Sequence, residues 1–186
     1  MLRASPDAQL RFVGLTGLWA SGDVSALSEI AANASLIPGL RVRQLLGRTI
    51  CGARQSAPAV IGALGVLAAS PDTAVCAADA LMYIHTVQTL PLLASLLDSG
   101  DTNVRERAIR GLSRFVDNLP VTTRYNTIDA KALVPQGPTP YRTAETDKYS
   151  LSIAPLSGAR FSEAEYLSFW KSWWAKMKAA VVANGQ

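Results

Sequence analysis

Few residues in this 186-residue chain could carry out acid–base or metal chemistry, and they are widely spaced. His85 is the only histidine. Near the end of a predicted helix, it suits a dipole-stabilised cation or a capping donor better than a catalytic group. Asp79 is the one carboxylate inside an apolar helix, where a raised pKa could make it catalytic. Exposure to solvent or a bond between subunits is the commoner role for such a carboxylate. The sequence therefore predicts no catalytic residue, no cofactor and no metal.

The two cysteines, Cys51 and Cys76, form neither a CxxC motif nor a Cys/His metal spacing. We interpret each as a buried or unreactive thiol, with a bridge between them as the alternative. The N-terminus lacks the apolar core of a signal peptide. The longest apolar run, 57–69, is too short to span a bilayer. These features predict a cytoplasmic protein with no membrane span, unless the chain was cut from a longer precursor.

Arginines gather in two places. Four lie between residues 30 and 71, where there is no acidic residue. Arg107, Arg110 and Arg114 form a stripe opposite the apolar face of a predicted helix. Phosphate backbones favour such stripes, but so do acidic protein partners, and any solvated helix face looks similar. The formal net charge of +4 is mild. We favour a protein partner over nucleic acid.

The segment FWKSWWAKMK, residues 169–178, carries three of the four tryptophans. Its aromatic residues fall on one side of a helix predicted over 163–182. Ser162 and Glu165 match a capping box, and Phe161 and Tyr166 occupy the positions of a hydrophobic staple. We predict that this helix caps the C-terminal end of the domain. A partner-docking helix and a helix on a membrane surface are the alternatives. The predicted cap residues are Phe161, Ser162, Glu165, Tyr166, Trp170 and Trp173.

Half of the chain is apolar, enough for one domain with a substantial core. Ser-Pro-Asp at 5–7 recurs at 70–72, and Ser-Gly-Asp at 21–23 recurs at 99–101. Each tripeptide suits a helix start, with Ser as a capping acceptor before Pro, or Asp capping after Gly. The apolar pattern of 104–115 also recurs at 73–84. The pattern predicts seven helices, over 6–20, 23–34, 39–53, 56–69, 71–85, 87–98 and 102–116.

Two segments resemble HEAT repeats of the short bacterial type, as in phycobilisome-lyase-like proteins: LRFVGLTGLWASGDVSAL (10–27) and TNVRERAIRGLSRFV (102–116). The matching positions are Leu10-Arg11, Gly17-Leu18, Gly22-Asp23, Val104-Arg105, Ala108 and Gly111-Leu112. The resemblance covers residues 5–116, although the unit that begins at Pro38 lacks the Gly-Asp turn. It implies a right-handed α-solenoid of stacked helical hairpins, which is usually a protein-binding surface.

The repeat pattern stops after Phe115. The sequence predicts repeats over 1–116, a Pro-rich irregular insertion over 117–160, and the capping helix within 161–186. Inside the insertion we expect one short helix near 129–134. Three tyrosines, Tyr125, Tyr141 and Tyr149, indicate that the insertion is partly pinned to the body. An ordered loop over the body is favoured, with a binding lid or disorder as alternatives.

On the first helix, Leu10, Val13, Gly17 and Leu18 are expected to face the core, which would leave Phe12, Leu15 and Trp19 on the other side. Terminal repeats normally carry a polar outer face. We therefore predict self-association, missing repeats or partner binding at this edge.

The favoured function is a non-catalytic scaffold for protein–protein interaction. The partner-binding candidates are Phe12, Trp19, Arg107, Arg110 and Arg114. The alternative is a HEAT-like enzyme of the lyase or DNA glycosylase type, or a nucleic-acid-binding module that uses the arginine stripes. A carboxylate at the base of a concave aromatic pocket would favour the enzyme.

Overall fold

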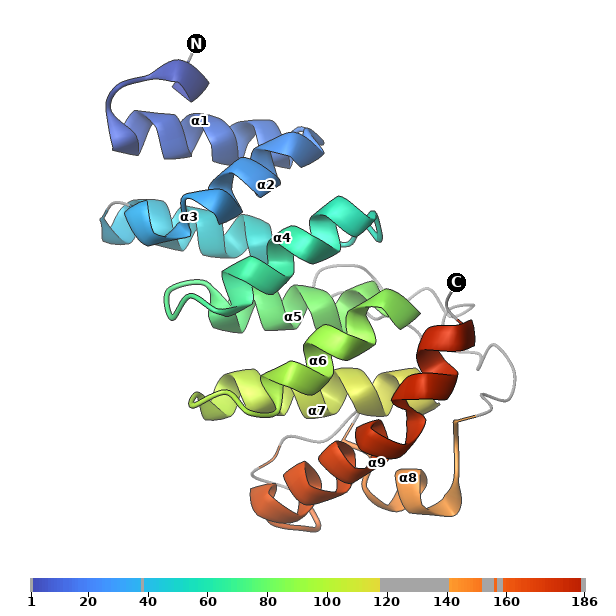
Figure 1. The fold of residues 1–186 in the computed structure, drawn as a ribbon. Helices are drawn as coiled ribbons and strands as arrows, with labels where there is room; N and C mark the ends of the chain where they lie inside the picture. The colour runs from blue at the N-terminus through green and yellow to red at the C-terminus, as the bar shows by residue number, and fades with distance from the viewer. Residues whose placement is uncertain (1, 38, 118–140, 152–155, 157–158, 185–186) are drawn as a thin grey trace, which may run out of the picture. The chain divides into compact units, whose positions relative to one another are not determined.

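The computed structural model describes residues 2–37, 39–117, 141–151, 156 and 159–184, which contain helices and turns but no strand. The prediction of seven α-helices before residue 117 is confirmed for the described part of the chain (Figure 1). The α-helices are α1 (Ala8–Ala20), α2 (Val24–Ala32), α3 (Leu40–Cys51), α4 (Pro58–Ala68), α5 (Ala74–Ile84), α6 (Leu90–Leu96), α7 (Thr102–Asp117), α8 (Ala144–Lys148) and α9 (Glu163–Asn184). Short 3-10 turns are η1 (Leu2–Ala4), η2 (Ala34–Leu36) and η3 (Val87–Thr89).

The chain divides into two compact units, unit 1 (Met1–Ala80) and unit 2 (Leu81–Gln186). The division falls inside α5 and within the region predicted to form repeats. The predicted short helix near 129–134 and Tyr125 lie outside the described residues.

Aspartates begin three of the helices, α1, α2 and α7. The Asp7 carboxylate accepts from the amides of Gln9 and Leu10 at 2.7 and 3.1 Å, so α1 starts after Asp7. Asp23 caps α2 in the same way, as its Ser-Gly-Asp motif predicts. Asp101 accepts from the Asn103 amide at 2.7 Å at the start of α7. The Ser5 hydroxyl does accept from the Asp7 amide, at 3.2 Å, but the N-cap of α1 is Asp7 and not Ser5. Helix α5 begins only at Ala74, so it does not start at the predicted Ser70 cap.

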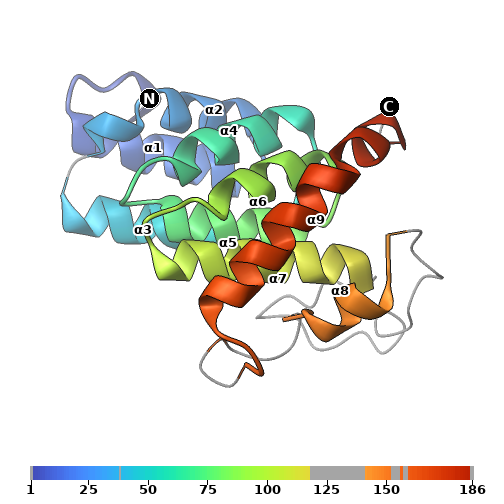
Figure 2. The same ribbon diagram turned by 60° about the horizontal axis from the view of Figure 1, so that its bottom comes forward.

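Helices α1 to α4 of unit 1 form two layers. Helices α1 and α2 pack as one hairpin, α3 lies beside α1, and α4 lies beside α2. Figures 1 and 2 both show α1 and α3 in one layer and α2 and α4 in the other. Helices that are two apart along the chain therefore lie side by side within this unit.

The orientation predicted for α1 is wrong. Phe12 and Trp19 are only 0% and 4% exposed, whereas Leu10 and Val13 face solvent. The Trp19 indole N–H donates to the Thr49 carbonyl of α3 at 3.4 Å, which fixes the buried side. The helix is apolar on nearly every side, so its periodicity does not select one face. Phe12 and Trp19 belong to the core of unit 1 and are not an exposed edge for a partner.

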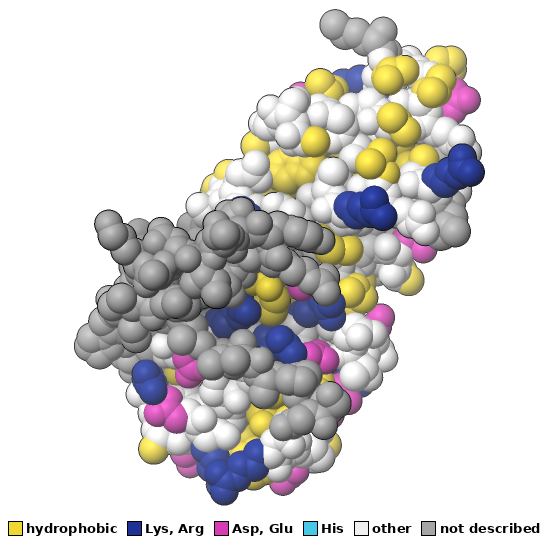
Figure 3. All heavy atoms as spheres, turned by 180° about the vertical axis from the view of Figure 1, so that it is seen from behind, with side chains coloured by type: hydrophobic (Ala, Val, Ile, Leu, Met, Phe, Trp, Pro, Cys, Tyr) yellow, Lys and Arg dark blue, Asp and Glu magenta, His cyan; other side chains and the backbone are white. Residues whose placement is uncertain are grey.

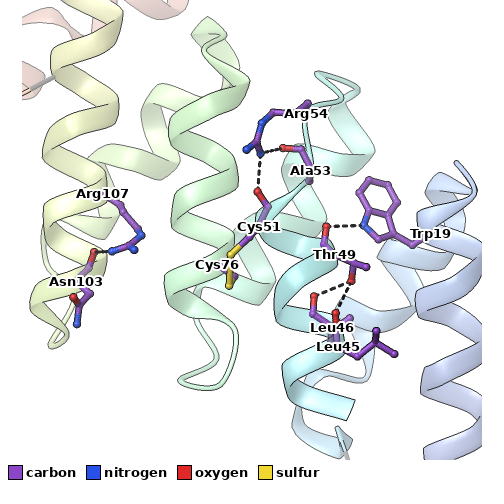
Figure 4. Close-up of a disulfide and its surroundings, with 10 residues drawn as sticks. All are labelled: Trp19, Leu45, Leu46, Thr49, Cys51, Ala53, Arg54, Cys76, Asn103 and Arg107. Atoms are coloured by element: carbon purple, nitrogen blue, oxygen red, sulfur yellow. Dashed lines mark hydrogen bonds between the residues drawn. A yellow bond between two sulfur atoms is a disulfide. The ribbon is translucent and has the colours of Figure 1, made fainter. Parts of the chain in front are cut away.

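A disulfide joins Cys51, the last residue of α3, to Cys76 in α5 (Figure 4). Their Cα atoms lie 4.5 Å apart. The interpretation of both cysteines as free thiols is therefore wrong, and the alternative of a bridge is confirmed. Spacing along the sequence did not indicate the pair, because the fold of α4 brings the two cysteines together. The bond links α3 to the part of α5 that belongs to unit 1.

Unit 2 is built on α7, whose apolar face is buried as predicted at Val104, Ala108, Ile109 and Leu112. Helices α6 and α9 pack on α7 and on each other, and α8 also contacts α7. Gly111 lets the Leu93 side chain of α6 approach closely, because a Cβ at this glycine would lie 2.8 Å from a Leu93 methyl carbon. This packing leaves one side of α9 available to form the wall of a cleft.

Candidate binding cleft between α8 and α9

A cleft of about 490 Å³ lies in unit 2 between α9 and the segment that contains α8. Its lining residues are mainly aromatic and polar: Tyr141, Thr143, Glu145, Tyr149, Glu165, Ser168, Phe169, Ser172, Trp173, Lys176 and Met177. The α9 residues among them run from Glu165 to Met177. At 1.5 Å per residue this part of the helix is about 18 Å long. The cleft is therefore elongated along α9.

The first turn of α9 is fixed by the predicted capping box. The Ser162 amide donates to the Glu165 carboxylate at 2.8 Å, and the Glu165 amide donates to the Ser162 hydroxyl at 3.4 Å. Phe161 and Tyr166 meet edge to face, with ring centroids 5.9 Å apart, as a staple requires. The Arg105 guanidinium of α7 binds the Glu163 carboxylate at 2.6 Å. These contacts fix the start of the helix against α7.

The buried side of α9 carries Tyr166, Trp170, Trp173 and Val181. The Trp170 indole N–H donates to the Tyr149 carbonyl at 3.1 Å, so this fully buried ring has its polar atom satisfied. Trp174 is only half-buried. The prediction that α9 covers apolar surface with Trp170 and Trp173, and leaves Trp174 nearer the rim, is confirmed.

The opposite wall of the cleft includes α8, a helix that was not expected from the sequence. Thr143 and Thr146 form a reciprocal capping box: each backbone amide donates to the other hydroxyl, at 2.7 and 3.2 Å. Tyr141 is buried and stacks on Phe115 at a centroid distance of 5.7 Å. The predicted pinning of the insertion is therefore confirmed at Tyr141. The Thr-x-x-Thr spacing is the signal that could have revealed α8.

Stacked rings line the cleft near the start of α9. Tyr149 lies between Phe169 and Phe161, with centroid distances of 4.4 and 4.7 Å and interplanar angles of 12° and 27°. The Lys148 ammonium lies 5.4 Å from the Tyr149 ring centroid. Tyr149 is pinned by these contacts, as predicted for the insertion. Each of these three rings contacts at least two other rings, which fixes its orientation.

Charged groups of both signs line the cleft, and they differ in their partners. Hydrogen bonds from the Ser162 hydroxyl and then from the Ser162 amide lower the pKa of Glu165, so this carboxyl is ionised and already engaged. Glu145 and Lys176 are exposed and form no ion pair with any residue that the structure describes. A carboxylate does line a concave aromatic pocket. However, a lowered pKa is the opposite of what a general acid needs.

The cleft contains none of the five residues predicted to bind a partner. Phe12 and Trp19 are in the core of unit 1. On α7, Arg107 donates to the Asn103 carbonyl at 2.9 Å, and Arg110 pairs with Glu106 at 2.7 Å. The Arg114 guanidinium lies over the Tyr83 ring, 4.7 Å from its centroid. All three arginines are only partly exposed, and each has an internal partner.

His85 does not act as a dipole-stabilised cation. Burial lowers the pKa of its imidazole, which favours the neutral ring. The Nε2 atom lies 3.2 Å from the Arg114 carbonyl, as a capping donor would. The residue also adopts a positive φ of 51°, a conformation that ends α5. Its role is structural, within unit 2.

Comparisons with family models, with curated proteins and with solved structures give no match for this chain. Among the described helices, none combines the length and the apolar character needed to cross a membrane. No group of three or more His, Cys, Asp or Glu residues in the described part of the chain is arranged to hold a metal ion.

Proposed function

We propose that this protein is a non-catalytic binding module that holds a short segment of a protein partner in the α8–α9 cleft. The observation that carries the proposal is the elongated aromatic lining of this cleft. An extended peptide advances about 3.3 Å per residue, so about five residues would match the length of the α9 wall.

The chemistry of the lining supports a peptide ligand. Phe169 and Met177 are half-buried and offer apolar contact to bulky side chains, and the largely buried Trp173 lies between them on the helix at i+4. Met177 can adjust its shape to different side chains. Ser168 and Ser172 place hydroxyls along one side of this row, and a peptide backbone can hydrogen-bond to both. Glu145 and Lys176 can select charged residues of the ligand at its ends.

The same observations weigh against the enzymatic and nucleic-acid alternatives. The engaged carboxylate of Glu165 has no role as a proton donor, and Glu145 stands at the surface rather than at the base of the cleft. The stripe of Arg107, Arg110 and Arg114 makes internal contacts, which reduces its value for binding phosphates. A scaffold function is the simplest account of a cleft that offers contact but no reactive group.

We also propose that the seven helices before residue 118 form a HEAT-like right-handed array. The side-by-side arrangement of α1 with α3 and of α2 with α4 in unit 1 supports this proposal. An experimental structure in which successive hairpins fail to stack with one constant right-handed rotation would overturn it.

The disulfide bears on where the protein works. Bonds of this kind persist in oxidising compartments and are rare in the cytosol. We infer an oxidising compartment, in place of the cytoplasmic location expected from the sequence. Mass spectrometry of the protein from its native source, after rapid alkylation, should show Cys51 and Cys76 unmodified by the alkylating reagent.

Peptide selection tests the proposed function. Random twelve-residue peptides displayed on phage would be selected against the full chain, and the binders measured against two variants. Ser172→Arg introduces a large side chain into the cleft from an exposed position. Ala175→Arg makes the same kind of change at a neighbouring exposed position of α9 that is not among the cleft-lining residues, and it serves as the matched control.

We expect peptides rich in aromatic and aliphatic residues, with affinity at least about tenfold weaker for Ser172→Arg, which corresponds to about 1.4 kcal/mol. Binding to Ala175→Arg should match the wild type. Equal binding to both variants, or a failure to select any peptide, would overturn the proposal. Thermal unfolding of both variants checks that neither change disturbs the fold.

A further inference from the structure

Unit 1 exposes apolar side chains on the outer side of its first layer. Leu10 and Val13 of α1 are 48% and 37% exposed, and Leu45 of α3 is 41% exposed. Gly17 follows Val13 by one helical turn, and nothing lies within 4 Å of the position that its Cβ would occupy. Arg41 and Arg48 flank Leu45 on the same side of α3. We call this surface the α1–α3 face; it comprises Leu10, Val13, Gly17, Arg41, Leu45 and Arg48.

The two helices that carry this face lie side by side in the same direction. Near their C-terminal ends, the Trp19 indole donates to the Thr49 carbonyl. Near their N-terminal ends, a Cβ at Gly39 would lie 3.5 Å from the Gln9 amide nitrogen. The row of Leu10, Val13 and Gly17 therefore runs parallel to the row of Arg41, Leu45 and Arg48. Figure 3, which views the molecule from behind, shows hydrophobic side chains on unit 1 with Lys or Arg side chains among them.

The charge of the α1–α3 face is positive and locally uncompensated. Arg41 and Arg48 are exposed and make no ion pair with the residues that the structure describes. Arg43, on the adjacent side of α3, pairs with Asp72 at 2.9 Å. Helix α1 contains no acidic residue, and the carboxylate of its N-cap, Asp7, accepts hydrogen bonds from two backbone amides. No acidic residue occurs between residues 30 and 71.

We propose that the α1–α3 face binds an acidic amphipathic helix of a partner protein. Aliphatic residues of the partner would contact Leu10, Val13 and Leu45. Its carboxylates would pair with Arg41 and Arg48, which are two helical turns, or about 10 Å, apart. The absence of a side chain at Gly17 lets the partner backbone approach α1 closely. Helix-on-face recognition of this kind uses apolar anchors at helical spacing, with flanking charges that set orientation.

Two other occupants fit this face less well. A second copy of the chain, related by two-fold symmetry, would bring its own Arg41 and Arg48 against the first pair, and like charges would repel. A nucleic acid would use the arginines but would leave three exposed aliphatic side chains against its phosphates. Only an acidic apolar partner complements both features of the face.

Methyl NMR of the full chain tests this inference independently of the α8–α9 cleft. The probe is a synthetic peptide of about five helical turns, with Leu at i, i+3, i+4 and i+7 and Glu on the flanking positions. A twin peptide carries Lys in place of every Glu. We expect the acidic peptide, at up to about 1 mM, to shift the methyl signals of Leu10, Val13 and Leu45. The lysine peptide should leave them unchanged.

Charge-reversed variants make the test specific. In Arg41→Glu/Arg48→Glu the preference should invert, so that the lysine peptide binds and the acidic peptide does not. The control, Arg160→Glu/Lys178→Glu, changes the net charge equally on unit 2 and should keep the wild-type preference.

Four results would overturn the inference: no shift at any concentration, equal shifts with both peptides, the same shifts with a single-stranded oligonucleotide of about 20 nucleotides, or the same shifts on raising the protein concentration alone. The last result would indicate self-association. A preference that fails to invert in the charge-reversed variant also contradicts the pairing with Arg41 and Arg48.

Discussion

The two units hold their helices together by different means. Unit 1 contains only two of the aromatic residues of the chain, Phe12 and Trp19, and relies on aliphatic packing, small residues and one disulfide. In unit 2, rings contact rings from His85 to Trp174. Both units retain apolar surface, but in different forms. Unit 1 presents isolated aliphatic side chains beside arginines, whereas unit 2 presents stacked rings inside a cleft.

This difference explains why each unit keeps part of its apolar surface exposed. Small residues allow close helix contact but cover little area, so the outer leucines of unit 1 remain exposed. A large ring covers about 150–250 Å², so α9 can both bury Trp170 and supply Phe169 and Trp173 to the cleft. The comparison predicts that the stability of unit 2 depends most on single aromatic rings, and that the stability of unit 1 depends most on its disulfide.

The largest effect is expected at Trp170. Replacement by alanine removes a fully buried ring and the hydrogen bond to the Tyr149 carbonyl, so the free energy of unfolding should fall by about 3–5 kcal/mol. Urea unfolding followed by circular dichroism measures the loss. Trp174→Ala, at a half-buried position of the same helix, is the control and should cost less than half as much. Equal losses in the two variants would contradict the assignment of Trp170 as the central ring.

The second largest loss of stability is expected on removal of the disulfide. For a sequence separation of 25 residues, the chain-entropy relation gives about 3.5 kcal/mol of stabilisation. Cys51→Ala/Cys76→Ala should lose about this amount when compared with the oxidised protein by urea unfolding. A reducing agent should destabilise the wild type and leave the double variant unchanged. If reduction has no effect on the wild type, unit 1 does not depend on its covalent link.

Two glycines of α1, Gly14 and Gly17, should respond differently to replacement by alanine. At Gly17 an alanine meets nothing, so Gly17→Ala should stabilise the protein by about 0.5–1 kcal/mol through helix propensity. At Gly14 the new Cβ would lie 2.6 Å from the Leu2 Cβ and 2.9 Å from the Leu2 carbonyl carbon. Gly14→Ala should therefore displace η1, and this displacement should cancel the stabilisation that alanine gives through helix propensity. Hydrogen exchange of residues 2–5 should accelerate only in Gly14→Ala; an unchanged rate would show that η1 is not packed there.

The smallest expected effect is a change in how stability depends on pH. Burial lowers the pKa of His85 in the folded state below the usual value of 6.5, so the unfolded chain binds the proton more readily. The contribution of this neutral ring to the free energy of unfolding is fully present above pH 6.5. It is lost as the pH falls below 6.5 toward the pKa of the folded state. His85→Asn suits the positive φ and removes the titration. Its stability should fall less between pH 7.5 and 5 than that of the wild type; identical profiles would rule out the buried histidine as the cause.

The contrast between α1 and α9 also explains what the sequence could predict. The aromatic residues of α9 lie on one side, with serines, alanines and lysines elsewhere, so periodicity identified the buried rings Trp170 and Trp173. Helix α1 is apolar around most of its circumference, and only tertiary contacts, such as the bond from Trp19 to α3, decide its orientation. Helix positions follow local propensity and caps, which is why all seven early helices could be predicted.

The cleft could not be predicted for a related reason. Its α9 wall follows from helical spacing, but its other wall depends on α8, a five-residue helix in a segment rich in prolines. Helices this short are stabilised by caps and tertiary contacts rather than by propensity. The pairing of Cys51 with Cys76 likewise depends on the fold of the intervening α4. The Thr-x-x-Thr cap of α8 is a local signal, but the packing of α8 on α7 and the pairing of the two cysteines are long-range contacts that no local pattern shows.

The disulfide has a consequence for the synthesis of the chain. Cys51 emerges from the ribosome 25 residues before Cys76, with all of α4 between them, so the bond cannot close until α4 and the start of α5 have been translated. Oxidation of this pair therefore reports that the second hairpin is complete. A pulse-chase experiment that follows the mobility of nascent chains would time this step.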